Sequence, residues 1–358
     1  MISICRKLAA RLGVPAVLGL MLSAVPGHAQ ETWSVEAWSE PFDYRSPSTT
    51  LDYAPLAAVS RPWRLCASYP HLKDSYWISV NYGMVEEARR LGIRLEVVEA
   101  GGYPNVERQI AQVRECAENA DILLLGTVSF DGLTETVLEI ATDIPVIAVV
   151  NDIADPGVTA KTGVWWVTMG RMVGDYLAEL HPAGSDPVKV AWFPGPDGSG
   201  WVPFVEEGFR GGLEASSAEI VVTKYGDTGK EIQLILVEEA LEERPDVDYI
   251  VGSAVAAEAA VSVLRARGLS DDIQVLADYF THAVYRGIKR DRILAAPTDF
   301  PVLQGRLGID QAVRMLEGEL EILHVGPAIQ MVTPDNVDVI GTTESLAPAS
   351  FTPTFVVE

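Results

Sequence analysis

The feature that most constrains the fold is an alternation of short apolar runs with amphipathic segments between residues 63 and 316. Runs such as DILLLG and PVIAVV are apolar throughout, which is typical of parallel strands that are covered on both faces. Segments with helical spacing, among them 79–91 and 106–119, separate these runs. Because strands that alternate with helices form right-handed βαβ units, the pattern predicts an α/β fold with parallel sheets.

The alternation stops at the aromatic stretch GVWWVTMG and then starts again, which predicts two doubly wound lobes. We expect an N-terminal lobe built from residues 63–168 and 299–320, and a C-terminal lobe built from residues 169–298. Two facing lobes of this kind enclose a ligand at the carboxyl ends of their strands. The organisation therefore indicates a hinged ligand-binding protein.

The segments that join and flank the lobes are predicted from the same pattern. A hinge should cross between the lobes near residues 165–169, 278–282 and 298–302. Residues 30–62 have scattered aromatic residues and no clear period, so we expect an extended N-terminal arm that docks on the body. Residues 321–358 are rich in proline and threonine and are expected to form an extended C-terminal tail.

Residues 1–29 have the features of a secretory signal peptide. Arg6, Lys7 and Arg11 precede an apolar stretch at 12–25, and Gly-His-Ala at 27–29 provides small residues for cleavage after Ala29. The alternative is a signal anchor that is retained, but the apolar stretch is short for a bilayer. The leader therefore predicts a protein exported to the periplasm.

The charge of the chain excludes one class of partner. Its 50 acidic residues outnumber its 27 basic residues and give a formal net charge of −23. Loss of the leader makes this charge more negative still. Such a surface repels nucleic acid and anionic lipid, so neither is expected as a partner.

Two cysteines, Cys66 and Cys116, remain after the leader. Both are expected toward the amino-terminal ends of the strands in the first lobe, and an oxidising compartment permits a disulfide between them. Two buried free thiols are the alternative, because spacing alone does not define connectivity. Neither cysteine has the spacing of a metal ligand, and we expect no metal site and no cofactor.

The residues that follow each strand are the candidates for a ligand site, because ligands bind at this edge of a parallel sheet. One carboxylate and five rings are expected to converge there: Asp74, Tyr76, Trp77, Tyr103, Trp166 and Tyr279. The alternative for Tyr76 and Trp77 is packing of the first helix against its lobe. Trp165 should face away from the cleft, because adjacent residues of an extended segment point to opposite sides. Tyr285 is the alternative to Tyr279.

Clustered rings suit two classes of ligand. Sugars stack on rings but also need many carboxylate, amide and arginine groups for their hydroxyls. A methylated ammonium group is held by ring faces, each contributing about 0.5 to 2 kcal/mol. No arginine follows a first-lobe strand, so the pattern favours a small methylated cation or dipole.

Several long strings in the chain are more specific than a fold pattern: CASYPHLKDSYWISVNYGM, EAGGYPN, GVWWVTMG, PGPDGSG, VYRGIKR and APTDFPVLQGRLGIDQAV. They run from about residue 60 to the end, and they resemble the TorT family of the trimethylamine N-oxide (TMAO) reductase regulatory system. The resemblance implies a type I periplasmic binding protein fold. It also implies that the chain binds TMAO and signals through the periplasmic domain of a membrane sensor histidine kinase of the TorS type.

The resemblance assigns the ring cage to Trp77, Tyr103, Trp166 and Tyr279, with Tyr76 and Asp74 beside them. Trp165 departs from the family pattern, which has a smaller or polar residue there. Trp201 departs too, because it lies in a glycine-rich turn that lacks an aromatic residue in the family. A related methylated amine or N-oxide is therefore an alternative ligand.

An enzyme and a transport receptor are the two alternatives to a sensory function. An enzyme is not expected, because the chain lacks G-x-G-x-x-G after its first strand, and GPDGSG lacks the glycine spacing of a nucleophile elbow. A solute receptor of an ABC transporter, for a methylated amine or a sugar, has the same fold and remains the alternative.

Overall fold

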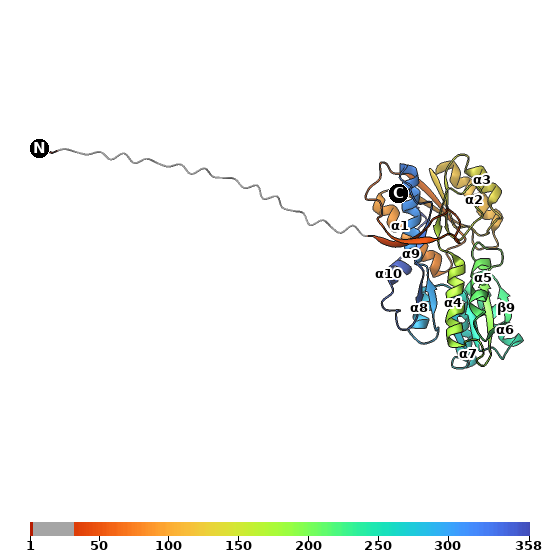
Figure 1. The fold of residues 1–358 in the computed structure, drawn as a ribbon. Coiled ribbons are helices and arrows are strands. Elements are labelled where there is room, and N and C mark those ends of the chain that lie inside the picture. Colours follow the sequence, from red (N-terminus) through yellow and green to blue (C-terminus); the bar gives the residue numbers. More distant parts are fainter. Residues whose placement is uncertain (3–31) are drawn as a thin grey trace. The chain divides into compact units, whose positions relative to one another are not determined.

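The structure is a computed structural model that describes residues 1–2 and 32–358. The predicted signal peptide lies mostly outside the described residues. No helix of the described part is both long and apolar enough to cross a membrane. Figure 1 shows that residues 32–358 form an upper and a lower α/β lobe.

The first lobe contains a sheet of nine strands within residues 32–358, in the order β15-β4-β3-β5-β6-β7-β13-β1-β2. Its central strands, from β4 to β13, run parallel, whereas β1, β2 and β15 pair antiparallel. The strands of this sheet are β1 (Trp33–Trp38), β2 (Ser48–Tyr53), β3 (Arg64–Tyr69), β4 (Arg94–Glu99), β5 (Ile122–Leu125), β6 (Val146–Val150), β7 (Ala160–Gly163), β13 (His324–Pro327) and β15 (Val356–Val357).

Helices cover both faces of this sheet. They are α1 (Ser75–Leu91), α2 (Val106–Asn119), α3 (Thr134–Ile140) and α9 (Pro301–Glu317). The chain leaves β3 for β4 on one side and returns past β3 to β5, so right-handed crossovers place α1 and α2 on opposite faces. Helix α9 packs beside α1 (Figure 1). Helix α1 ends at Gly92, whose φ of 67° is the left-handed conformation that glycine adopts without strain.

The second lobe contains a parallel sheet in the order β11-β10-β8-β9. Its strands are β8 (Val188–Gly195), β9 (Ala218–Tyr225), β10 (Tyr249–Gly252) and β11 (Gln274–Ala277), and its helices are α4 (Trp166–Leu180), α5 (Val202–Leu213), α6 (Lys230–Glu243), α7 (Ala254–Arg267) and α8 (His282–Ile288). Helices α4 and α5 approach closely, since a Cβ on Gly170 would lie 1.9 Å from the carbonyl oxygen of Val205. The two doubly wound lobes predicted from the alternation are present.

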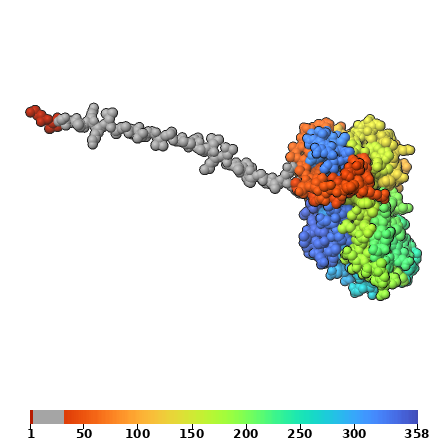
Figure 2. Space-filling view, in the orientation of Figure 1, coloured from red at the N-terminus to blue at the C-terminus, as the bar shows by residue number. Residues whose placement is uncertain are grey.

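The flanking segments have more structure than the extended arm and tail that the sequence predicts. Within 30–62, β1 and β2 form a hairpin that pairs with β13 and extends the first sheet. Within 321–358, the tail adds β13, β14 (Gln330–Val332), α10 (Thr342–Ser345) and β15. Strand β14 pairs with β12 (Ala296–Thr298) beside the second lobe, and β15 pairs with β4 in the first. The blue C-terminal part of the chain is visible on both lobes in Figure 2.

The crossings between lobes lie between β7 and α4, between β12 and α9, and between β13 and β14. The predicted crossing near 278–282 is wrong. Residues on both sides of it belong to the second lobe, because β11 and α8 both pack against α7. The crossing at 328–329 is not predicted from the sequence. It lies in the segment rich in proline and threonine that is expected to form an extended tail.

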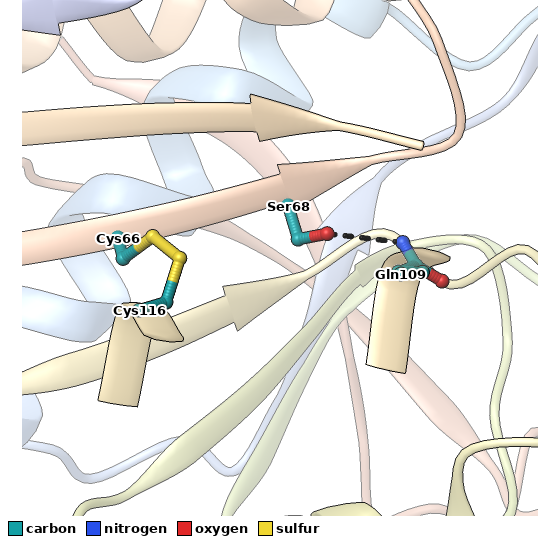
Figure 3. The surroundings of a disulfide bond; sticks show 4 residues. All are labelled: Cys66, Ser68, Gln109 and Cys116. Carbon is teal, nitrogen blue, oxygen red and sulfur yellow. Dashed lines mark hydrogen bonds between the residues drawn. A yellow bond between two sulfur atoms is a disulfide. The ribbon is translucent and has the colours of Figure 1, made fainter. Parts of the chain in front are cut away.

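A disulfide joins Cys66 of β3 to Cys116 of α2, with 5.8 Å between their Cα atoms (Figure 3). A second link between the same elements lies about two turns of α2 away, nearer the carboxyl end of the strand. There the Gln109 amide donates to the Ser68 hydroxyl at 3.1 Å and to the Gly126 carbonyl oxygen at 2.9 Å. Helix α2 is therefore held to the sheet by a covalent bond and by buried hydrogen bonds.

Candidate ligand-binding site

A buried cavity lies where the carboxyl ends of the strands in the two lobes meet. Both lobes and the first crossing contribute to its wall: Asp74, Tyr76, Trp77, Tyr103, Asn151, Trp166, Trp201, Thr228 and Tyr279. The cavity volume is about 10 Å³, which is about the space that one water molecule needs. Each of the six rings is at most 7% exposed, so the cavity is enclosed by aromatic side chains.

The loop after β3 supplies Asp74, the N-cap of helix α1, and the first turn of α1 supplies Tyr76 and Trp77. The Asp74 carboxylate accepts the backbone N–H of Tyr76 at 3.0 Å and of Trp77 at 3.1 Å. This cap places both rings on the first turn of the helix, at the edge of the cleft. A Cβ on Gly126 would lie 2.5 Å from the Trp77 ring, so glycine at the end of β5 lets the indole pack there.

The loops after β4 and β6 supply Tyr103 and Asn151. The Asn151 amide donates to the Tyr103 hydroxyl at 3.2 Å and to the carbonyl oxygen of Thr127 at 2.7 Å. Gly102, with a φ of 144°, lets the chain turn before Tyr103. These bonds fix the Tyr103 ring against the first lobe.

The remaining rings form a continuous series across the cleft. The ring centroids are 5.4 Å apart for Trp166 and Trp201, 5.7 Å for Trp201 and Tyr279, and 5.2 Å for Tyr279 and Tyr76. Tyr76 and Trp77 follow at 6.0 Å. Most of these pairs are edge-to-face, so ring faces remain available to a group placed among them.

The electrostatics of the site come from buried groups. Burial raises the pKa of Asp74 above its ordinary value, against the opposing effect of His71. Burial also raises the pKa of Asp299 to about 6, and this carboxylate accepts the Tyr76 hydroxyl at 2.6 Å. The indole N–H of Trp201 is buried and has no hydrogen-bond partner within residues 32–358. The site thus offers ring faces, one lining carboxylate and one free N–H donor.

Several contacts close the lobes over this cavity. His71 of the first lobe shares a hydrogen bond of 2.8 Å with the Thr228 hydroxyl of the second. Lys73 forms an ion pair of 3.5 Å with Asp227. A ligand can therefore enter only when these contacts open.

All six residues predicted for the site lie around this one cavity. Trp165 is half-buried, does not line the cavity, and forms the N-cap of α4. Trp201, Asn151 and Thr228 also line the cavity but are not among the six predicted residues. A signal for Trp201 existed, because it follows strand β8 in the same way that the other rings follow their strands.

Comparison with known proteins agrees with this architecture. Residues 67–320 match the family model described as a periplasmic binding protein domain. The periplasmic protein TorT of Escherichia coli (strain K12) is 43% identical over 304 residues, which are 84% of this chain and 86% of that protein.

Two solved structures are similar throughout most of their length. One is an ABC transporter solute binding protein from Bradyrhizobium sp. BTAi1 with bound Bis-Tris. It is 46% identical with a TM-score of 0.77, and the match covers 90% of this chain and 98% of that one. The other is the complex of the TorS sensor domain with TorT in the presence of TMAO. The matched chain is 41% identical with a TM-score of 0.75, and the match covers 82% of this chain and 99% of that one.

The fold and the enclosed cavity define a two-lobed periplasmic ligand-binding protein rather than an enzyme. The chain belongs to the periplasmic binding protein family and, within it, to the family of TorT. The protein is located in the periplasm.

Proposed function

We propose that the protein captures TMAO in the aromatic cavity between its lobes and signals through the periplasmic domain of a TorS-like sensor histidine kinase. The observation that supports TMAO as the ligand is the enclosure of a very small cavity by six rings and one carboxylate. The complex of a TorS sensor domain with TorT and TMAO, in which the matched chain is 41% identical to this one, supports the partner.

The chemistry of TMAO fits the groups that line the cavity. Its three methyl groups carry the positive charge of the nitrogen and favour ring faces, which here come from both lobes. Its oxygen needs a hydrogen-bond donor, and the unpartnered N–H of Trp201 is the candidate, because both amide hydrogens of Asn151 are already donated to Tyr103 and Thr127. Asp74 adds a negative charge that favours the cationic nitrogen.

Size and polarity argue against a sugar. A cavity of about 10 Å³ can expand by small ring movements for a ligand of few heavy atoms, but not for a pyranose without separating the lobes. The three non-aromatic lining residues, Asp74, Asn151 and Thr228, are also too few for the hydroxyls of a sugar. A related methylated amine or N-oxide remains the alternative ligand.

Ligand capture should close the lobes about the chain crossings near 165–169 and 298–302. In this proposal residues 63–168 with 299–320 move as one lobe and residues 169–298 as the other. Small-angle scattering of the protein with and without saturating TMAO measures the closure. Superimposable curves would show that the ligand does not change the arrangement of the lobes.

Calorimetric titration of the mature protein with TMAO, trimethylamine, glycine betaine and ribose tests the ligand. We expect binding heat with TMAO and none with ribose. Tighter binding of betaine than of TMAO would overturn the assignment of TMAO as the ligand and leave the fold assignment intact.

A second candidate is the solute receptor of an ABC transporter, which the 46% identity to such a protein favours. The two functions differ in the protein that recognises the closed form. Binding of the purified kinase sensor domain supports sensing. A sensor domain that does not bind, together with stimulation of a neighbouring transporter's ATPase, would support transport.

A further inference from the structure

Two adjacent hollows on the α7–α8 side of the second lobe share Arg286 as a common wall. The first, about 460 Å³ in volume, lies between α7 and α8 and is lined by Arg265, Arg286, Arg290 and Arg292. The second, about 660 Å³, is lined by Arg286 together with Arg306 of α9. We call these two hollows the arginine groove. Four of its five arginines are exposed, and Arg306 is partly buried.

The arginine groove is unusual because four of its five arginines have no ion-pair partner within residues 32–358 of a very acidic chain. Within residues 32–358, every lysine has a carboxylate within 4.0 Å. The arginines of that range without such a carboxylate are Arg94, Arg265, Arg286, Arg290 and Arg306. All of them except Arg94 line the groove.

The groove also has little negative charge of its own. Among its lining residues the one carboxylate is Glu258, and this group already accepts Lys230 at 2.8 Å. Asp271, which is 95% exposed, pairs with Arg292 at its rim. A formal net charge of −23 provides many carboxylates elsewhere, yet within residues 32–358 no carboxylate lies within 4.0 Å of the other four arginines.

Helix dipoles account for only part of this arrangement. Arg265 lies in the last turn of α7, and Arg286 lies in the last turn of α8, where a cation is stabilised by about 0.3 to 1 kcal/mol. Arg306 is inside α9 and gains nothing from a helix end. The convergence of arginines from α7, α8 and α9 on one groove therefore needs another cause.

We propose that the arginine groove docks an acidic segment of the partner protein. Guanidinium groups bind carboxylates in a bidentate manner, and they gain most where no internal carboxylate competes. The concave shape fits a peptide segment better than a flat membrane, and the acidic remainder of the surface repels anionic lipid. The two hollows together exceed the space that a single small anion needs.

The groove also touches both lobes, so a bound segment would report their arrangement. Tyr82 of α1 and Arg306 of α9 line it from the first lobe, and His282 and Tyr285 of α8 line it from the second. Ala347 of the tail connects these walls, because its N–H donates to Ser79 of α1 and its carbonyl oxygen bonds His282. Lobe closure should change the distance between Arg306 of the first lobe and the four arginines of the second, and therefore the affinity for the segment.

This inference rests on the proposed function for the identity of the partner, and the experiment separates the two. The affinity of the kinase sensor domain is measured for the wild type, for Arg286→Glu and for Arg94→Glu. Arg94→Glu is the matched control, since it reverses an equally unpaired arginine outside the groove. We expect Arg286→Glu to weaken binding by at least about tenfold, with an intermediate effect of Arg286→Gln and little effect of Arg94→Glu.

The heat of TMAO binding serves as the check on folding and should be equal in all variants. Equal sensor-domain affinity of wild type and Arg286→Glu would overturn the inference while leaving the proposed function intact. A wild type that binds no sensor domain would overturn the proposed partner. In that case the binding of an oligoglutamate peptide to the protein is measured instead. Peptide binding that weakens with salt and is abolished by Arg286→Glu would still support the arginine groove as a docking site for an acidic segment. Failure of the peptide to bind would overturn it.

Discussion

Replacement of Trp166 by alanine should strongly weaken binding of TMAO, whereas replacement of its neighbour Trp165 should not. Trp166 is 3% exposed and lines the cavity, with its ring 5.4 Å from that of Trp201. Trp165 is half-buried and does not line it. The two substitutions remove the same side chain from adjacent positions, so each serves as the control for the other.

The magnitude follows from the contribution of one ring face. A ring over a methylated ammonium contributes about 0.5 kcal/mol when exposed and about 2 kcal/mol when desolvated. Trp166 is almost fully buried, so the higher value applies to it. A loss of about 2 kcal/mol corresponds to a loss of about 30-fold in affinity.

Calorimetric titration with TMAO measures the affinity of both variants. Thermal unfolding is needed beside it, because the Trp166 indole also donates to the carbonyl oxygen of Val150 at 3.1 Å. Truncation of a buried Trp costs about 3 to 5 kcal/mol of stability. Trp166→Phe keeps a ring face and should retain most of the affinity, which separates loss of the cage from loss of the fold. Equal losses for Trp165→Ala and Trp166→Ala would refute the assignment of the cage.

Three further predictions concern a buried charge, the disulfide and lobe closure. Burial raises the pKa of Asp299 to about 6, so between about pH 4 and pH 6 the folded state retains a proton that the unfolded chain has released. Stability from this group is therefore present below about pH 4 and falls by about 3 kcal/mol as the pH rises past 6. Asp299→Asn should remove that part of the pH dependence in denaturant unfolding, and an unchanged profile would contradict the argument. Joint replacement of Cys66 and Cys116 by serine should lower the free energy of unfolding by about 4 kcal/mol for a separation of 50 residues, and a change below about 1 kcal/mol would contradict it. Gly200→Ala should hold the lobes apart, because its Cβ would lie 2.0 Å from a carbonyl oxygen of the first lobe. TMAO affinity should fall, while Gly211→Ala, with 3.8 Å to its nearest neighbour, should bind normally.

The sequence predicts the central strands and the helices well because their burial is local and periodic. Strands such as Ile122–Leu125 and Val146–Val150 are buried throughout, which an apolar run signals directly. The same reasoning cannot find edge strands. Val356–Val357 contains two residues and exists because it pairs with β4, which lies far away in the sequence.

The candidate site was predictable to the extent that the chain places residues directly after strands. Asp74, Tyr103 and Tyr279 all follow strands, and the structure brings them to one cavity. Trp201 obeys the same rule, but the resemblance does not predict it, because the family pattern has no aromatic residue at this turn. Thr228 was not accessible from sequence, since its contact with His71 depends on how the two lobes face each other.

The order of strands in the first sheet has a consequence for export. Strand β1, near the start of the chain, pairs with β13 at residues 324–327, and β4 pairs with β15 at residues 356–357. The sheet of the second lobe, in contrast, is made by residues 188–277 alone. A chain that leaves the membrane from its N-terminus can therefore complete the sheet of the second lobe first. The sheet of the first lobe cannot be completed until almost the last residue has emerged. Until then its strand edges are unpaired, and during this interval the chain is most exposed to aggregation and proteolysis.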